Sequence, residues 1–305
     1  MDSLHDDVVI HPLAKSRLRG TCAAMTDVLL VSKTPLARRL ASDDRDRLAA
    51  GGVLDYGRLE SSAERQAEAL TAVRAAVHGL TTREVRVDEL QPTDAVGVRL
   101  VITVGGDGTV FTANTLVTSA PYLTVNSDPE RSVGHFTRFT SATVADGIRA
   151  WRDGSAAREA LHRLAITVEG TTYRILNDVL FSHTNPAVLA RYVLACDGVR
   201  EFQRSSGVWI STAHGSTAAI HSAGAVPVPG HLPALLFKVR EPFLGREPMH
   251  LLAGTQLPPR GLSLTPALPG MALYLDGPNL TVPIAPGMNI DIQAASEPLM
   301  LINPA

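Results

Sequence analysis

The sequence predicts an α/β N-terminal domain, with a parallel sheet and helices on both faces, followed by a β-rich, layered-sheet C-terminal domain. Strand-like and helix-like segments alternate in the first half, which is typical of βαβ units. Short runs rich in β-branched residues dominate the second half, with Pro and Gly between them. We place the boundary near residue 155. The expected domains are 1–155 and 156–292, and a C-terminal strand within 293–305 can return to the first domain.

Hydrophobic periodicity defines the elements of the first half. Val28 to Val31 and Leu100 to Val104 are apolar runs of the kind found in strands buried on both faces. Apolar residues recur at helical spacing over 62–78, where Ser61 and Glu64 form a predicted capping box. Further strands are expected at 83–87 and 122–125, and further helices at 109–119 and 142–152.

Strand-like runs dominate the second half, and only 216–223 suggests a helix there. The expected strands are 164–168, 173–180, 190–195, 208–212, 234–239, 272–275, 280–284 and 299–302.

Bulk composition fits a folded protein and narrows its partners. Of 305 residues, 45% are hydrophobic and 19% charged, and the mean hydropathy is +0.09. The net charge of -2 argues against nucleic acid or an anionic membrane as a partner. Neither Cys22 nor Cys196 has metal-type spacing, and a reduced intracellular chain is the simpler interpretation. Residues 1–25 suggest a loose extension and resemble neither a signal peptide nor a transit peptide, so we expect a cytoplasmic protein.

A glycine-rich loop, Gly105-Gly106-Asp107-Gly108-Thr109, joins a buried strand to a helix. Such a loop suits an anion, because unpaired amides and the helix dipole favour negative charge. Thr109 can cap the helix. Asp107 would repel bound phosphates, so we expect it to accept a proton from an attacking hydroxyl or to help hold Mg²⁺. On the loop alone, an ordinary tight turn with aspartate as turn former is the alternative.

Two standard phosphate-binding motifs are absent. The sequence has no G-x-x-x-x-G-K-[ST], and no lysine between Lys33 and Lys238, which excludes a P-loop NTPase. The dinucleotide fingerprint G-x-G-x-x-G is also missing at this loop, where Gly108 is followed by Thr-Val-Phe.

Two polar features interrupt the apolar strands of the second half. Asn177 and Asp178 are adjacent within a predicted strand, so they would point to opposite faces and at least one would meet the core, another domain or a ligand. We favour a ligand over a structural hydrogen bond. The segment 211–218, Ser-Thr-Ala-His-Gly-Ser-Thr-Ala, leads from a strand into a hydroxyl-rich helix start. It suits a polyol, ribose or phosphate, and a simple capped helix is the alternative.

In this order and spacing, the glycine loop, Asn177-Asp178 and segment 211–218 resemble the ATP-NAD kinases. The run 126–135, Asn-Ser-Asp-Pro-Glu-Arg-Ser-Val-Gly-His, looks like the mitochondrial type, as do Ser-Ser-Gly at 205–207 and Arg-Glu-Pro at 240–242. The resemblance extends from about residue 27 to 277. Diacylglycerol and sphingosine kinases share the first loop but lack the combination of the other two motifs.

The resemblance implies transfer of the γ-phosphate of ATP to the 2′-hydroxyl of the adenosine ribose of NAD, giving NADP. Asp107 would be the general base, and Mg²⁺ would accompany ATP. No dedicated metal ligands are expected. The nucleotide and phosphate ligands would be Gly105, Gly106, Gly108, Thr109 and Arg131. The NAD-binding residues would be Asn177, Asp178, Ser206, Thr217, Ala218, Ser222 and His135.

Two departures from the family pattern concern the acceptor. Ala219 stands where typical members have an aromatic residue, and Ser206 stands where common members have aspartate, although the mitochondrial type shares that serine. The alternatives are therefore a kinase of the same fold that phosphorylates another nucleoside or polyol, and a catalytically inactive dinucleotide-binding regulator. The presence of Asp107 argues against the latter. ATP and NAD are the expected substrates, without nucleic acid or membrane. A homodimer or higher homo-oligomer is implied, with sites that can take residues from a neighbouring subunit.

Overall fold

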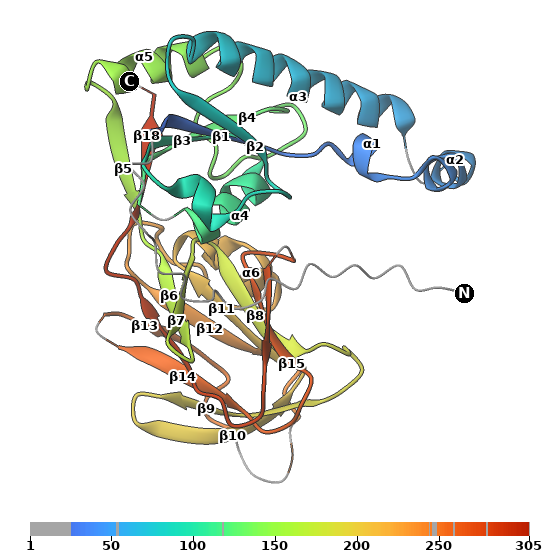
Figure 1. Ribbon diagram of the computed structural model, residues 1–305. Helices are drawn as coiled ribbons and strands as arrows, with labels where there is room; N and C mark the ends of the chain where they lie inside the picture. The colour runs from blue at the N-terminus through green and yellow to red at the C-terminus, as the bar shows by residue number, and fades with distance from the viewer. Residues whose placement is uncertain are drawn as a thin grey trace. The chain divides into compact units, whose positions relative to one another are not determined.

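The computed structural model describes residues 26–52, 55–117, 119–243, 245, 249–258, 260–278 and 280–304. The predicted N-terminal extension, 1–25, lies outside these ranges. The described residues form two compact units, an α/β unit of 26–160 with 299–304 and a β-rich unit of 161–298 (Figure 1). The first contains a parallel sheet with helices and the second contains antiparallel sheets, so the predicted fold class is confirmed.

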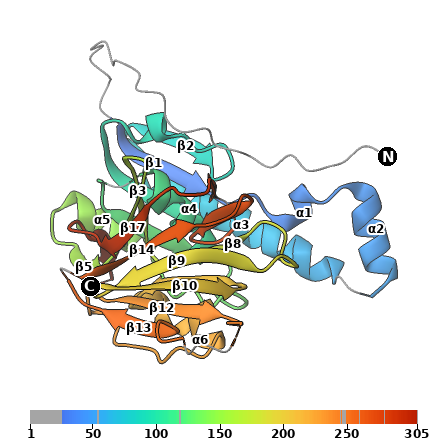
Figure 2. The same cartoon turned by 90° about the horizontal axis from the view of Figure 1, so that it is seen from below.

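The α/β unit is built on a six-stranded sheet with the order β2-β1-β3-β4-β18-β5. Strands β2, β1, β3 and β4 are parallel neighbours, and β18 pairs parallel with β4. Two short helices, α1 and α2, lead from β1 to the long helix α3 (Figure 2). The elements are β1 (Thr26–Ser32), α1 (Leu36–Arg39), α2 (Ser42–Ala50), α3 (Tyr56–Ala76), β2 (Thr82–Arg86), the 3₁₀ helix η1 (Pro92–Ala95), β3 (Val98–Gly105), α4 (Asp107–Leu116), β4 (Tyr122–Asn126), α5 (Val144–Arg152), β5 (Ala157–Leu161) and β18 (Leu299–Asn303).

Helices cover both faces of this sheet. α3 and α5 lie on one face, and α4 lies on the other (Figure 1). Alternate residues of β1, β3 and β4 pack with Val73 of α3 and Ile148 of α5, as the pleat of a strand requires. Helix α4 buries Val110 and Ala113. The central strands are therefore apolar on both sides, which explains their continuous hydrophobic runs.

Helix α3 begins earlier than the sequence indicates. Its N-cap is Asp55, whose Oδ1 accepts a hydrogen bond from the Arg58 amide at 3.1 Å. The predicted Ser61–Glu64 capping box is wrong, because Ser61 lies inside the helix and its hydroxyl donates to the Arg58 carbonyl at 3.2 Å. The Asp55 cap satisfies the first amides of the helix six residues earlier, which is about 1.7 turns.

The β-rich unit contains two six-stranded antiparallel sheets, with the orders β10-β9-β14-β17-β6-β7 and β13-β12-β11-β8-β15-β16. Its elements are β6 (Leu164–Val168), β7 (Thr171–Ile175), β8 (Asp178–His183), β9 (Ala190–Cys196), β10 (Val199–Ser205), β11 (Gly207–Thr212), the 3₁₀ helix η2 (His214–Thr217), α6 (Ala219–Ser222), β12 (Leu235–Arg240), β13 (Ala253–Gln256), β14 (Gly261–Pro266), β15 (Met271–Leu275), β16 (Leu280–Ile284) and β17 (Ile290–Ala294).

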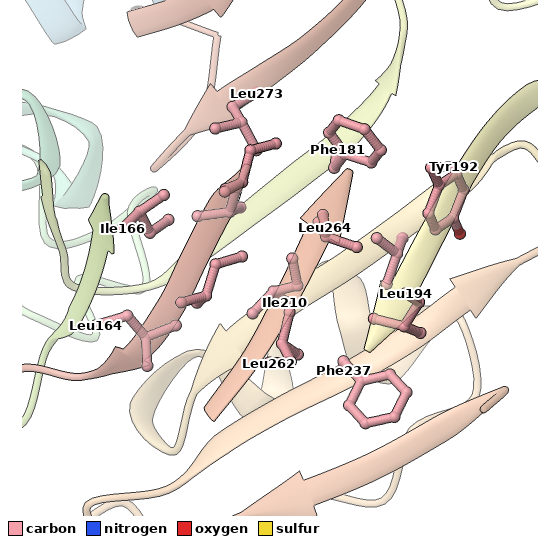
Figure 3. Packing of buried hydrophobic residues seen from close by; sticks show 14 of the residues in the cluster. Leu164, Ile166, Phe181, Tyr192, Leu194, Ile210, Phe237, Leu262, Leu264 and Leu273 are labelled. Carbon is pink, nitrogen blue, oxygen red and sulfur yellow. The ribbon is translucent and has the colours of Figure 1, made fainter. Parts of the chain in front are cut away.

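One apolar core joins these two sheets. Leu194 and Leu264 from the first sheet pack with Ile210 and Phe237 from the second (Figure 3). The ring of Phe181 meets that of another core residue, Tyr192, edge to face, with ring centroids 5.2 Å apart. The sheets therefore pack face to face as a sandwich, as the prediction of layered sheets requires.

The single strand predicted over 173–180 is two strands. β7 ends at Ile175, β8 begins at Asp178, and the two belong to different sheets. The amides of Leu176, Asn177 and Asp178 all donate to the Asp276 carboxylate instead of continuing a strand ladder. The predicted helix at 216–223 is likewise replaced by η2 followed by α6, which is only four residues long.

Two other features bear on the sequence expectations. Cys196 is a free, buried thiol, and Cys22 lies outside the described residues. No helix in the described part of the chain is long and apolar enough to cross a membrane.

Candidate active site

The glycine loop lies at the carboxyl end of β3 and forms the first turn of α4. Gly105 is the last residue of β3, and a Cβ on it would lie 2.3 Å from the Thr109 hydroxyl, so any larger residue would force Thr109 to shift. A Cβ on Gly108 would meet nothing within 4 Å. None of the loop glycines has a positive φ. They allow close approach of the backbone, not a left-handed conformation.

Thr109 does not cap α4, contrary to the sequence expectation. The N-cap is Gly106, without a side-chain cap, and the Thr109 amide donates to the Gly106 carbonyl at 3.0 Å. The Thr109 side chain is buried against Gly105 instead. In an α-helix the first amides have no intrahelical acceptor, so the amides of Gly106 to Gly108 are the ones suited to an anion.

The Asp107 carboxylate is held by the loop that follows β4. Its Oδ2 accepts a hydrogen bond from the His135 amide, and its Oδ1 accepts one from the Phe136 amide, both at 2.8 Å. The carboxylate is half-buried. The His135 ring is exposed and lies edge to face with Phe136, at 4.9 Å between centroids. His135 thus touches the predicted base through its backbone.

This loop is anchored to α3 at two points. Arg65 of α3 donates to both carboxylate oxygens of Asp128, from Nε at 2.8 Å and from Nη2 at 3.3 Å. Burial favours a higher pKa for Asp128, but the hydrogen bonds and charge of Arg65 hold the pKa below its usual value. Arg131 donates to the Arg58 carbonyl at 2.9 Å and the Ser61 hydroxyl at 2.8 Å, so its guanidinium faces the helix in this structure.

The two polar features of the β-rich unit form one structure. The Asn177 carbonyl accepts hydrogen bonds from the Thr212 amide at 3.0 Å and the Ser211 hydroxyl at 3.2 Å. A Cβ on Gly215 would lie 2.1 Å from that carbonyl oxygen. Segment 211–218 therefore packs directly on the backbone of Asn177, and its glycine is required by this contact.

Asp276 is a buried carboxylate that sequence reasoning missed. It accepts amide hydrogen bonds from Leu176 at 2.8 Å, Asn177 at 2.7 Å and Asp178 at 3.1 Å. Burial raises the pKa of Asp276 to about 7, against these hydrogen bonds, and the Asp178 charge adds to the rise. Burial also raises the pKa of Asp178 to about 6. The available signal was an aspartate-glycine pair, Asp276-Gly277, directly after the apolar strand β15.

The remaining predicted NAD ligands fall into two places. Thr217 and Ser222 are exposed, and Ala218 between them is half-buried at the junction of η2 and α6. Ser206 precedes β11, whereas Ser211 near the other end of β11 pairs with Asp178. At about 3.3 Å per residue, Ser206 is roughly 16 Å from Ser211 along the strand. The fold of the chain therefore does not bring Ser206 next to Asn177, Asp178 and segment 211–218.

The described residues contain no group of three or more His, Cys, Asp or Glu side chains that could hold a metal ion.

Two motif groups, the glycine loop with Asp107 and the pair Asn177-Asp178 with segment 211–218, define together with the fold a phosphotransferase that has an α/β unit and a β-sandwich unit. The chain is 32% identical over 240 residues to a probable NADH kinase of Oryza sativa subsp. japonica, covering 68% of this chain and 71% of the relative. It is 30% identical over 235 residues to an NADH kinase of Arabidopsis thaliana, covering 65% and 70%. It is 28% identical over 211 residues to an NAD kinase of Methanoregula boonei, covering 68% and 75%. The chain belongs to the NAD kinase family, so the resemblance to that family inferred from the motifs is confirmed.

Solved structures show the same fold. An NAD kinase from Archaeoglobus fulgidus in complex with ATP has a TM-score of 0.63 at 15% identity, covering 90% of this chain and 93% of that one. Yeast NADH kinase complexed with NADH has a TM-score of 0.63 at 15% identity, covering 93% and 85%. No family model matches the sequence.

Proposed function

We propose that this protein transfers the γ-phosphate of ATP to the 2′-hydroxyl of the adenosine ribose of NAD, giving NADP. Membership of the NAD kinase family supports this reaction. The observation that carries the proposal is the position of Asp107. Its carboxylate stands at the first residue of α4, beside the open backbone of Gly108, and two amides fix its orientation. A carboxylate among phosphate-binding amides serves the transfer step rather than anion binding alone.

In the transfer step, Asp107 accepts the proton of the attacking hydroxyl. Each carboxylate oxygen uses one lone pair on an amide, which leaves a lone pair for the proton. The 2′-oxygen forms a bond to the γ-phosphorus, the bond from that phosphorus to the β–γ bridging oxygen breaks, and ADP leaves. The proton then passes from Asp107 to solvent. Fixed orientation of the base reduces the entropy that the transition state must lose.

The first turn of α4 binds the phosphates in this proposal. The amides of Gly106 and Gly108 point to the anion, and the α4 dipole adds to the attraction. Gly105 and Thr109 shape the turn through their close contact. Mg²⁺ would accompany ATP, because it takes phosphate oxygens and water, and it would neutralise charge on the phosphates. Asp107 is assigned to the proton transfer, so no carboxylate of this loop is reserved for the ion.

The acceptor binds to the β-rich unit in this proposal. Asn177 and Asp178 hold adenine and ribose groups of NAD, with Thr217, Ala218 and Ser222 beside them. We also assign His135, through its exposed ring, and Arg131, on release from α3, to the substrates. The clamped backbone at Asn177 supports the assignment, because a fixed backbone preorganises its side chains.

Ser206 and the assembly belong to the same proposal. The separation of Ser206 from the Asn177 group fits a site completed by a neighbouring subunit, as the family resemblance implies. We therefore propose a homodimer or larger homo-oligomer in the cytoplasm. Light scattering during gel filtration measures the mass. A fully active monomer would contradict the shared site.

A direct assay tests the proposed reaction. Purified protein is incubated with ATP, Mg²⁺ and either NAD or NADH, and NADP or NADPH is measured with a specific dehydrogenase. We expect product with at least one of the two acceptors. Absence of product at every concentration, with ATP consumed on another nucleoside, would show that the acceptor is different.

Replacement of the base tests the mechanism. We expect Asp107→Asn to reduce kcat by about 10²–10⁴-fold, because the amide cannot take the proton. NAD binding should stay within about threefold, since the base contributes little to ground-state affinity. Asp146→Asn, on the exposed face of α5, is the matched control and should keep full activity. Undiminished activity of Asp107→Asn would remove this residue from the mechanism.

A further inference from the structure

The strand order of the α/β unit reverses between β1 and β3. The chain runs from β1 to β2 on one side of β1 and then returns to β3 on the other side. In doubly wound sheets, ligands bind where the strand order reverses in this way. Gly105 and Gly106 occupy the β3 side of the reversal, and Lys33 follows Ser32 on the β1 side.

Lys33 lies directly beside the glycine loop. Its amide donates to the Val104 carbonyl at 3.0 Å, which continues the pairing of β1 with β3. A Cβ on Gly105 would lie 3.2 Å from the Lys33 Cβ, so the Lys33 side chain leaves the sheet next to the glycine loop. No other lysine lies within the described part of the α/β unit.

The ammonium of Lys33 is partly desolvated and forms no ion pair within the described part of the chain. Lys33 is half-buried, and burial lowers its pKa, an effect that the Asp128 charge opposes. No ion pair or side-chain hydrogen bond of Lys33 occurs among the described residues, and Asp128 is already bonded to Arg65. A partly desolvated, unpaired ammonium is unfavourable in the free protein. An anionic ligand would remove that penalty.

A second polar group at the carboxyl ends of these strands, the Ser127 hydroxyl, has no hydrogen-bond partner among the described residues. Ser127 follows β4, and its amide donates to the Gly105 carbonyl at 3.2 Å. Its hydroxyl is buried and finds no hydrogen-bond partner in the described structure, and only 4% of the residue surface is exposed. Buried hydroxyls are normally hydrogen-bonded, so the Ser127 hydroxyl also indicates a ligand at the carboxyl ends of β3 and β4.

We propose that Lys33 binds the phosphate oxygens of ATP beside the glycine loop, an inference that rests on the proposed function. The loop itself contains a carboxylate and no cation, although a triphosphate is highly charged. A compact ammonium on a flexible stem suits phosphate oxygens as a point charge. The residue directly after β1 thus supplies a cation that P-loop enzymes carry within their glycine motif.

Calorimetry with two probes tests the assignment. Inorganic tripolyphosphate and ATP, each with Mg²⁺, are titrated into the full chain and into Lys33→Met and Lys33→Arg. We expect Lys33→Met to weaken both probes by about 10- to 100-fold, as for loss of one charged hydrogen-bonding group. Lys33→Arg should stay within about fivefold. NAD, which carries a diphosphate of its own, should bind all three proteins within about twofold.

Controls separate a ligand contact from a structural role. Arg149→Met removes an exposed positive charge from α5 in the same unit and should leave both affinities unchanged. Lys33→Met should keep or raise Tm, since it removes an unpaired, half-buried charge. Lys33→Gln is a second neutral variant in case the methionine variant folds poorly. A lower Tm with unchanged tripolyphosphate affinity would give Lys33 a structural role only.

The outcome for Lys33 is distinguishable from that for the proposed function. Tripolyphosphate binding that depends on Lys33, in a protein that makes no NADP, would retain this inference and overturn the acceptor. NADP formation with an unchanged KM for ATP in Lys33→Met would support the proposed function and overturn the assignment of Lys33. A wild-type protein that binds neither probe overturns both.

Discussion

Asp276 offers a sharp test of how the β-rich unit holds its predicted NAD-binding segment. Three consecutive amides, those of Leu176, Asn177 and Asp178, converge on one carboxylate, with Leu176 on Oδ2 and the other two on Oδ1. In Asp276→Asn the new amide oxygen replaces Oδ1 and keeps two of these bonds. The new NH₂ group then faces the Leu176 amide, and two donors cannot bond to each other.

The magnitude follows from the lost bond. Leu176 is fully buried, so its amide cannot form a replacement hydrogen bond to water. An unsatisfied buried donor costs about 1–3 kcal/mol. At about 2–4 °C per kcal/mol for a unit of this size, a middle value lowers Tm by about 4–8 °C. Asp276→Ala removes all three acceptors and should lower Tm further.

The pH dependence has a definite sign. The folded pKa of Asp276, about 7, lies above the value of 3.8 for a free aspartate. The folded protein therefore binds more protons between these pH values, and the contribution of this group to stability falls as pH rises through about 7. Asparagine does not titrate. The variant should lose most stability relative to wild type at pH 5, and the difference should shrink by pH 8.

Differential scanning fluorimetry of both proteins from pH 5 to 8, with the KM for NAD at pH 7.5, measures these effects. We expect a higher KM for NAD, since the backbone of Asn177 loses part of its support. Exposed Asp291→Asn, on β17, is the matched control. Equal Tm values at pH 5, or a difference that grows with pH, would refute the reasoning.

Two other contacts give predictions of the same kind. Arg65→Ala should reduce kcat by about 10- to 100-fold with little change in the KM for NAD, because the loop that orients the catalytic carboxylate loses its bond to α3 at Asp128. Arg74→Ala, which removes an exposed ion pair from the same helix, should leave kcat and the KM for NAD unchanged. Gly215→Ala should destabilise the β-rich unit by about 1–3 kcal/mol and raise the KM for NAD, because its methyl group would meet the Asn177 carbonyl at 2.1 Å. A normal Tm and KM in that variant would mean that the turn relaxes without loss.

The longest periodic patterns were predicted, whereas the short strands β14 and β17 were missed although they alternate buried and less buried residues. Helix α3 and the central strands β1 and β3 bury residues at regular spacing, and the sequence shows them clearly. The short helices α1 and α2 bury no residue, so they leave no such pattern. Strand β10 was missed because it lies at the edge of its sheet and carries charged residues among its apolar ones.

The candidate site was predictable where the motif is local. The glycine loop and segment 211–218 are each continuous, and close contacts explain Gly105 in the first and Gly215 in the second. Asp276 lies 100 residues from Leu176 in sequence, and only the folded sandwich brings them together. Lys33 also gave no sign from spacing, because its place beside Gly105 depends on the pairing of β1 with β3.

The position of β18 has a consequence for the order of folding during synthesis. This strand pairs with β4, and its residues Leu299, Leu301 and Ile302 are buried, so it belongs to the core of the α/β unit. In the chain it follows the whole β-rich unit. While the ribosome is producing 127–298, β4 lacks β18 beside Tyr122, although Phe139 can already pair with Val125 on the same side of the strand. The sandwich is therefore free to fold first, and the nascent α/β unit must keep an apolar sheet edge open until β18 emerges.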